Sequence, residues 1–261
     1  MKTICKNCGH EFKGNYCNEC GQKATVKRFS TRIIFSDIIN KVFPLEKGLL
    51  YTIRQLFIRP GFMVRGYLEG KRARFTKPLQ FLLLITAISL IFFSHEEFMS
   101  GLKAGLEIQD NNTNQGNEAA LAKIVDWLES NWTLLMVGIV PFMAFTSRWI
   151  YRKQDLNYAE HFVAACYFNA GSILLTMPFL ILLFWVYKSR FQSLLFGVFI
   201  TFFIGYFIWC YVGLFNTKKS WSIGLKALLS LVLGYFIYVM ALGLLVFLGT
   251  QLYASIIGVE G

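Results

Sequence analysis

Five long apolar runs beyond residue 78 restrict the fold of this chain more than any other feature. Hydrophobic residues make up 55% of its 261 residues and are concentrated in these runs. Each run approaches the roughly 20 residues that a helix needs to cross the hydrocarbon core of a bilayer. The sequence therefore predicts an all-α polytopic membrane protein with about five transmembrane helices. The predicted spans are 78–95, 131–150, 162–187, 191–215 and 225–249 within a domain of residues 78–261.

Two of these runs depart from a simple crossing. The second, "WTLLMVGIVPFMAFTS", carries Pro141 near its middle, where the missing amide proton predicts a kink. Trp132 and Trp149 border this run, as expected of aromatic anchors at membrane interfaces. The fifth run stays uncharged as far as Val259, which is too long for one straight crossing. We expect its tail in the outer interface or against neighbouring helices.

The distribution of charge predicts the orientation of the spans. Residues 1–78 hold 16 of the 26 Lys and Arg residues but 5 of the 15 acids, so they carry a net charge of +11. The polar loop at about 96–130 contains two lysines and seven acids. Because cytoplasmic segments are enriched in Lys and Arg, we expect a cytoplasmic N-terminus and an external loop. Five spans then place the C-terminus outside.

Four cysteines near the N-terminus have the spacing of a metal site. Cys5, Cys8, Cys17 and Cys20 form C-x2-C-x8-C-x2-C, so each pair can turn and present two thiolates to one ion. Each pair is followed by a glycine, which permits a sharp turn that directs N–H groups toward sulfur. So small a unit cannot bury a core, and we expect metal ligation to supply its folding free energy. Residues 1–24 are therefore predicted to be a zinc ribbon that holds one structural Zn²⁺.

Two alternatives for the cysteines stay open at this point. Paired disulfides would require an oxidising compartment, whereas rubredoxin-like iron would use similar knuckles. Four protein thiolates close the site and leave no position for water or substrate, which favours a structural role over a catalytic one. A fifth ligand would be surplus, so His10 is interpreted as a surface residue.

Residues 25–77 have the pattern of short, basic amphipathic helices. Apolar residues recur at helical spacing in three sets separated by Pro44 and Pro60, the first over residues 34–43. One interpretation lays these helices on a membrane with their cations toward anionic headgroups, and the other packs them against the cytosolic ends of the spans. Positive-inside bias explains the basic balance, so no nucleic acid partner is expected. The candidate lipid or partner contacts are Arg54, Arg59, Arg65, Lys71, Arg72 and Arg74.

The stretches "CKNCGHEFKGNYCNECGQKA" and "EKGLLYTIRQLFIRPGFMVRGYLEGKRARFTKPLQFLLL" carry a family resemblance. They resemble an uncharacterised bacterial family of zinc-ribbon inner-membrane proteins, domain of unknown function 3667. The resemblance implies a CxxC ribbon fused to an integral membrane domain, with no assigned reaction and no catalytic residue to carry over. The five-span layout is also loosely similar to Yip1-type membrane proteins. Besides the four cysteines, the matching positions are Thr52, Pro60, Gly61, Tyr67, Gly70, Lys71, Arg72 and Pro78.

Polar residues within the third predicted span form a candidate membrane site. Glu160 and His161 lie at its cytosolic mouth, and Asn169 lies about two turns deeper. Such groups are functional candidates because leaving them unpaired in lipid is costly. Glu160 and His161 are adjacent, however, and point about 100° apart on a helix, so they do not form a dyad. The simpler interpretation is an interfacial cap and an interhelical hydrogen bond from Asn169.

The sequence leaves three functional hypotheses. The first is a non-enzymatic scaffold whose cytosolic ribbon and interfacial helices dock a protein partner or anionic lipid. The second is a transporter or channel for an ion or small solute, with the ribbon as a gate or assembly element. The third, a membrane enzyme acting on a lipid, depends on Glu160 and His161 alone. A homo-oligomer is compatible with all three.

Overall fold

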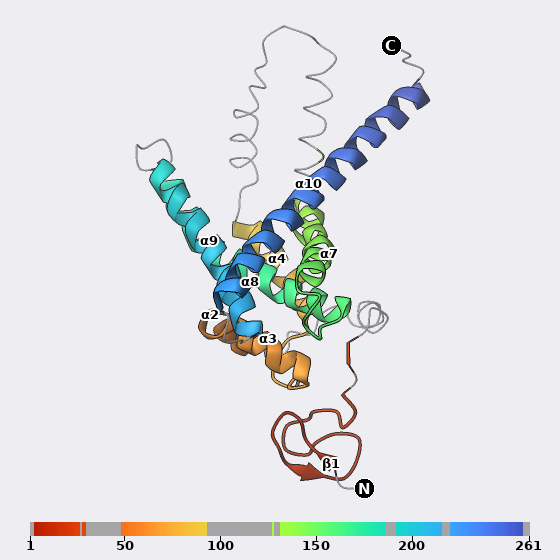
Figure 1. The fold of residues 1–261 in the computed structure, drawn as a ribbon, viewed down its shortest axis with the longest axis vertical. Coiled ribbons are helices and arrows are strands. Elements are labelled where there is room, and N and C mark those ends of the chain that lie inside the picture. The colour runs from red at the N-terminus through yellow and green to blue at the C-terminus, as the bar shows by residue number, and fades with distance from the viewer. Residues whose placement is uncertain are drawn as a thin grey trace.

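The ribbon and a helical bundle lie at opposite ends of one long axis (Figure 1). The computed structural model is mostly helical, and α2 and α3 cross the end of the bundle that faces the ribbon. We call this end the ribbon side of the bundle. The structure describes residues 3–26, 28–29, 48–92, 127, 131–185, 192–215 and 220–257.

The ribbon is built on a short antiparallel pair, β1 (Thr3–Ile4) and β2 (Glu11–Phe12). Its buried apolar cluster consists of Phe12 with Cys5 and Cys17. Because so small a cluster offsets little of the entropy lost on ordering the chain, the ribbon needs another source of stability.

The helices α2 (Leu49–Ile58) and α3 (Pro60–Glu69) form what we call the platform. Pro60 occupies the first turn of α3, where it needs no hydrogen-bonded N–H, and it cannot continue α2. The platform ends at Gly70, which adopts a left-handed φ of 115° and donates its N–H to the carbonyl of Tyr67 at 3.2 Å. This glycine therefore ends the helix and turns the chain toward the bundle.

Among the described residues, three of the five bundle helices are long and apolar enough to cross a membrane. The bundle consists of α4 (Pro78–Phe92), α7 (Trp132–Ile150), α8 (Tyr158–Trp185), α9 (Gln192–Phe215) and α10 (Ser220–Ile257). The candidate spans lie within α8, α9 and α10. The described apolar parts of α4 and α7 are shorter, and α7 contains Pro141 as expected. The chain thus has the helices of a membrane protein, but the predicted count of about five spans is not confirmed.

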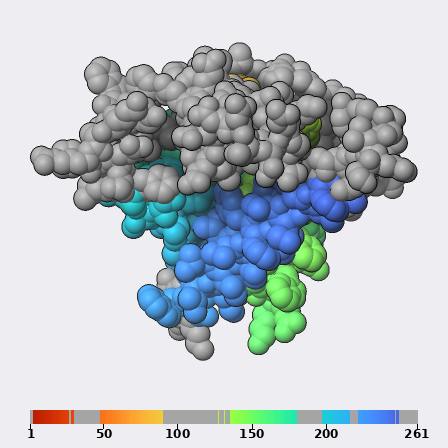
Figure 2. Space-filling model, turned by 90° about the horizontal axis from the view of Figure 1, so that it is seen from above, coloured from red at the N-terminus to blue at the C-terminus, as the bar shows by residue number. Residues whose placement is uncertain are grey.

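The centre of the bundle is α8, which contacts α4, α7 and α9 as well as both platform helices. In its candidate span 61% of the residues are buried, against 33% for α9 and 17% for α10. The helix α10 packs on α7 and α9, and its surface is exposed between them on the face seen in Figure 2. A membrane protein needs such an apolar outer surface because lipid surrounds it.

The platform packs against the bundle through a close backbone crossing. A Cβ atom added at Gly61 of α3 would lie 2.2 Å from the carbonyl oxygen of Cys210 in α9. The facing residue on α9 is Gly213, whose added Cβ would lie 3.1 Å from the Cα of Gly61. Two glycines therefore allow the backbones of α3 and α9 to approach closely. One face of the platform thus packs against the bundle.

Several predictions fall outside the described residues. They include the first amphipathic set at 34–43 and the external loop at 96–130, of which the structure describes only residue 127. The ends of the predicted spans at 93–95 and 186–187 lie outside the described residues too.

Candidate functional site

The four ribbon cysteines converge on one point. Their Sγ atoms all lie within 4.8 Å of one another, with Cys5 and Cys20 at 3.5 Å and Cys8 and Cys17 at 3.6 Å. An ion with metal–sulfur bonds of about 2.3 Å requires sulfurs about 3.8 Å apart in a tetrahedron. The cysteines are free, since a disulfide would need sulfurs about 2.0 Å apart. Four thiol ligands in this arrangement suit a metal ion with tetrahedral coordination.

The two CxxC knuckles are built in the same way. In the first, the N–H of Cys5 donates to the carbonyl of His10 at 2.9 Å, and Gly9 donates to the carbonyl of Cys5 at 2.9 Å. In the second, Cys17 and Gly21 make the equivalent bonds at 2.8 and 2.9 Å. Gly9 and Gly21 adopt φ of 79° and 71°, a left-handed conformation that side chains disfavour. This repetition explains why each CxxC is followed by glycine.

The ribbon contacts the end of the platform. The side-chain oxygen of Gln22, directly after the second knuckle, accepts a hydrogen bond from the N–H of Arg72 at 3.3 Å. Gly70 leaves room for Lys6 and Val26, whose side chains would come within 3.1 and 3.3 Å of an added Cβ. The metal-ligand segment and the end of the platform are therefore in direct contact.

Arg72 differs from the other basic residues predicted to contact lipid or a partner. Its guanidinium lies over the ring of Phe29 at 3.8 Å from the ring centroid, and Phe29 stacks on Tyr67 at 5.7 Å. Burial lowers the pKa of Arg72, while the aromatic faces stabilise its charge. Arg72 thus acts in the packing of the platform. The remaining predicted contacts, Arg54, Arg59, Arg65, Lys71 and Arg74, are exposed.

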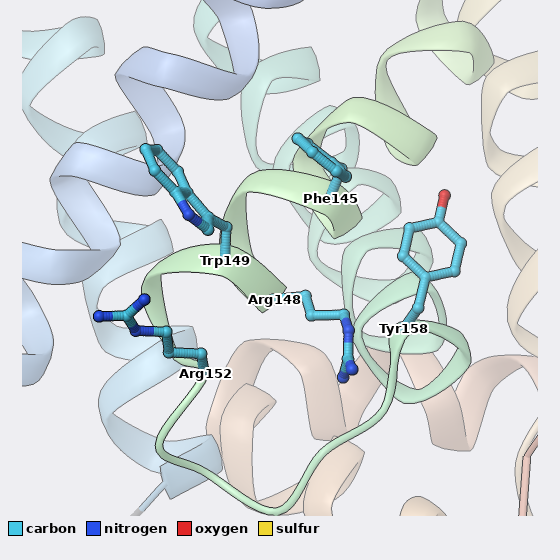
Figure 3. A pocket seen from close by; sticks show the side chains of 5 residues that line it. All are labelled: Phe145, Arg148, Trp149, Arg152 and Tyr158. Carbon is cyan, nitrogen blue, oxygen red and sulfur yellow. The ribbon is translucent and has the colours of Figure 1, made fainter.

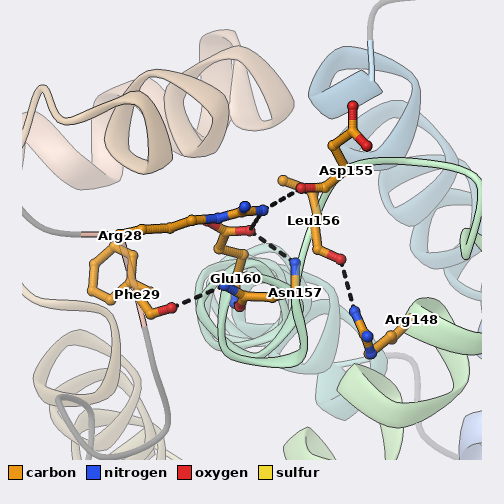
Figure 4. A network of polar contacts seen from close by, with 7 residues as sticks. All are labelled: Arg28, Phe29, Arg148, Asp155, Leu156, Asn157 and Glu160. Carbon is orange, nitrogen blue, oxygen red and sulfur yellow. Dashed lines mark hydrogen bonds and ion pairs between the residues drawn. The ribbon is translucent and has the colours of Figure 1, made fainter.

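Arg28, just beyond the ribbon, is joined to Glu160 at the N-terminus of α8 (Figure 4). Its Nε and Nη2 atoms donate to the two carboxylate oxygens at 2.7 and 2.8 Å, and Nη2 also donates to the carbonyl of Asp155. The Glu160 side chain is 6% exposed, whereas that of Arg28 is 62% exposed. The hydrogen bonds to Glu160, together with its negative charge, raise the pKa of Arg28. The pair connects residues 132 positions apart in the chain.

Glu160 also caps its own helix. The N–H of Asn157 donates to the Glu160 carboxylate at 2.8 Å, and the N–H of Glu160 donates to the Asn157 side-chain oxygen at 2.9 Å. This reciprocal pair is a capping box, which satisfies amide protons at the start of a helix. The side-chain amide of Asn157 also donates to the carbonyl of Phe29 at 2.9 Å. Asn157 therefore joins the same network.

His161 and Asn169 have other partners. His161 is buried and its Nδ1 lies 2.9 Å from the hydroxyl of Ser147 in α7. No described residue pairs with its Nε2 atom. Asn169 donates to the carbonyl of Met136 at 3.0 Å, which is an interhelical bond from α8 to α7. The structure thus gives Glu160, His161 and Asn169 separate partners.

Sequence analysis missed Arg28, Phe29 and Asn157. A signal for Asn157 was present, because "NYAE" places Asn three residues before Glu at the start of an apolar helix. Neither Arg28 nor Phe29 has a local signal, since both act through contacts more than 30 residues away in the chain.

The family model for proteins of unknown function DUF3667 matches residues 46–90. This segment spans the platform and most of α4. Its distinctive residues have structural roles here, among them Pro60 and Gly70 at the ends of α3 and Gly61 at the crossing with α9. No curated protein and no solved structure matches the chain.

Proposed function

We propose that this chain is a non-enzymatic scaffold of the bacterial inner membrane, with its N-terminus and ribbon in the cytoplasm. The platform rests on the anionic membrane surface, and the ribbon beside it receives a protein partner. The observation that carries this proposal is the two-faced character of the platform.

One face of the platform packs on the bundle while the other is apolar and basic. The inner face of α2 buries Thr52 and Leu56, and α3 buries Gly61 and its neighbours. On the outer face Leu50 is 79% exposed, and Phe57, Ile58 and Phe62 are also exposed. Such apolar exposure is unfavourable in water but suits the boundary between headgroups and acyl chains.

Cations lie among these exposed apolar side chains. Arg54 and Arg59 are exposed and have no carboxylate partner in the described ranges, while Arg65 pairs with Glu69 at 3.0 Å. Free guanidinium groups beside an apolar helix face favour an anionic membrane surface, where each contributes about 1 kcal/mol. The platform therefore combines packing against the bundle with contact to lipid.

The ribbon supplies the second half of the proposal as a structural zinc unit. Four thiolates close its coordination sphere, which supports a role in folding and recognition and gives no position for a substrate. Its exposed aromatic and aliphatic side chains, Tyr16 and Ile4, are 61% and 65% exposed and suit contact with a protein.

The transport alternative requires polar groups that share a cavity. Each candidate polar residue has its own partner instead. Arg28 is bonded to Glu160, Ser147 to His161, and the carbonyl of Met136 to Asn169. The described contacts therefore support helix capping and interhelical bonding more than a pathway or a lipid-hydrolysing site.

Photo-crosslinking in vesicles tests the proposal. A benzophenone amino acid at Phe57 should label phospholipid, with more label in anionic than in zwitterionic vesicles. The matched position is Tyr16 on the ribbon, which should label little lipid in the same vesicles and should label a protein once a cytosolic fraction is added. Exclusive labelling of protein at Phe57 would show that the platform is a protein interface and would refute its contact with lipid.

A further inference from the structure

A pocket of about 340 Å³ lies between α7 and α8 on the ribbon side of the bundle (Figure 3). Phe145, Arg148, Trp149, Arg152 and Tyr158 line it. None of these residues belongs to the ribbon or to the platform, and Arg148 alone also appears among the polar contacts of Figure 4, through its bond to Leu156. The volume falls in the range of ligand pockets, about 300–1,000 Å³.

Most of the pocket comes from one stripe of α7. Phe145, Arg148, Trp149 and Arg152 follow one another at steps of three, one and three residues, which places them on one side of a helix or its immediate extension. Tyr158, the first residue of α8, closes the other side. Aromatic and basic residues alternate along the eight residues from Phe145 to Arg152, but their side chains separate in space. Figure 3 shows the rings of Phe145 and Trp149 on one side and the guanidinium groups of Arg148 and Arg152 on the other.

The pocket, with its aromatic side and its basic side, lies at the expected membrane boundary. The candidate span of α8 begins at Tyr158, and the described apolar part of α7 ends at Ile150. Trp and Tyr are enriched at such boundaries because they have an apolar ring and a polar edge. Phe145 and Trp149 remain 57% and 60% exposed, so the apolar end of the pocket is open to the bilayer.

The two guanidinium groups lie at the other end and point to opposite sides of the end of α7 in Figure 3, so both exposed side chains must turn inward to hold one anion. Arg148 donates one Nη1 bond to the carbonyl of Leu156 at 2.9 Å, which leaves most of its five donors. Arg152 is exposed, and neither arginine has a carboxylate partner within the part of the chain that the structure describes. Among the described residues, no side chain therefore neutralises these two exposed cations.

We propose that this pocket binds an anionic phospholipid, whose phosphate is held by Arg148 and Arg152 and whose acyl chain lies along Phe145 and Trp149. The aromatic side and the basic side of the pocket match the acyl chain and the headgroup of the lipid. Arginine suits this role because its planar donors match phosphate oxygens. This site is separate from the platform and depends only on the helices α7 and α8 lying in a membrane.

Native mass spectrometry of the full-length protein with defined lipids tests the site. Phosphatidylglycerol should remain bound, and the double variant R148Q/R152Q should lose at least about tenfold in affinity. The control K153Q removes a neighbouring exposed cation that does not line the pocket, and it should leave the affinity within about twofold. Equal losses in both variants would refute a specific pocket and indicate a diffuse effect of charge.

Two further measurements identify the ligand. W149A should weaken long-chain phosphatidylglycerol more than a dihexanoyl form, because the acyl chain contacts the indole. Inorganic phosphate should not displace the lipid, and phosphatidylcholine should bind more weakly. Displacement by phosphate, or an equal effect of W149A on both chain lengths, would overturn the lipid assignment and leave an anion site. Size-exclusion profiles and metal content matching the wild type would show that each variant is folded.

Discussion

The ribbon and the centre of the bundle are stabilised in opposite ways. The ribbon buries little more than Phe12 and two cysteines, and its order depends on four sulfurs that come from 16 consecutive residues. The bundle is stabilised by packing and hydrogen bonds between segments far apart in the chain. Arg28 is bonded to Glu160 of α8, and Gly61 of α3 packs on Gly213 of α9. Local chemistry therefore determines the first region, and long-range fit determines the second.

Removal of the metal ligands should produce the largest difference in stability between the ribbon and the bundle. C5S/C17S should lose the bound ion and the ribbon fold, because structural zinc in small domains contributes on the order of 10 kcal/mol. The helical content and thermal stability of the bundle should change little. Elemental analysis and circular dichroism of the purified protein measure the two effects.

The control for this experiment is C166S, which removes a buried thiol of α8 far from the cluster. It should retain one zinc ion per chain. Iron in place of zinc would contradict the proposed zinc site. A bundle that unfolds together with the ribbon would contradict the proposed independence of the two regions.

A side chain at Gly61 should have the opposite effect. In G61A the new Cβ would meet the backbone of α9 at 2.2 Å, and backbone cannot rotate away as a side chain can. We expect a loss of about 1–3 kcal/mol in stability of the bundle, with metal content unchanged. Thermal unfolding in detergent measures it. G197A is the matched control, since nothing lies within 4 Å of an added Cβ there.

The same contrast decides how much could be predicted from sequence. The cysteine cluster follows from spacing, because metal ligation needs only neighbouring residues to turn back on themselves. The apolar helices follow from composition, but α4 and α7 are described over apolar lengths too short to establish five spans. The long-range partners of Glu160 and Gly61 could not be predicted, since nothing in a sequence relates positions 28 and 160 or 61 and 213.

Breaking the Arg28–Glu160 pair tests how the two regions are coupled. E160Q keeps the shape of the side chain but removes its charge, so it should weaken the contact with Arg28, by an amount that the exposure of Arg28 reduces. Hydrogen exchange at the residues around Phe29 should accelerate, while metal content stays constant. The control is E69Q, whose exposed pair with Arg65 should be worth less than about 0.5 kcal/mol. Equal effects of the two variants would show that the Arg28–Glu160 pair does not couple the ribbon to the bundle.

The smallest effect should appear inside the ribbon, where the two knuckles offer an internal comparison. G9A and G21A each force alanine into a left-handed conformation, at φ of 79° and 71°, with open space around the new methyl group. The cost is therefore conformational alone, about 1 kcal/mol at each site, or about fivefold in apparent metal affinity. Competition with a chelator measures it. Because the knuckles make the same backbone bonds, the two variants should agree within about twofold. A much larger loss at Gly21 would mean that the contact of Gln22 with Arg72 adds long-range stabilisation to the second knuckle, so that the ribbon is not purely local.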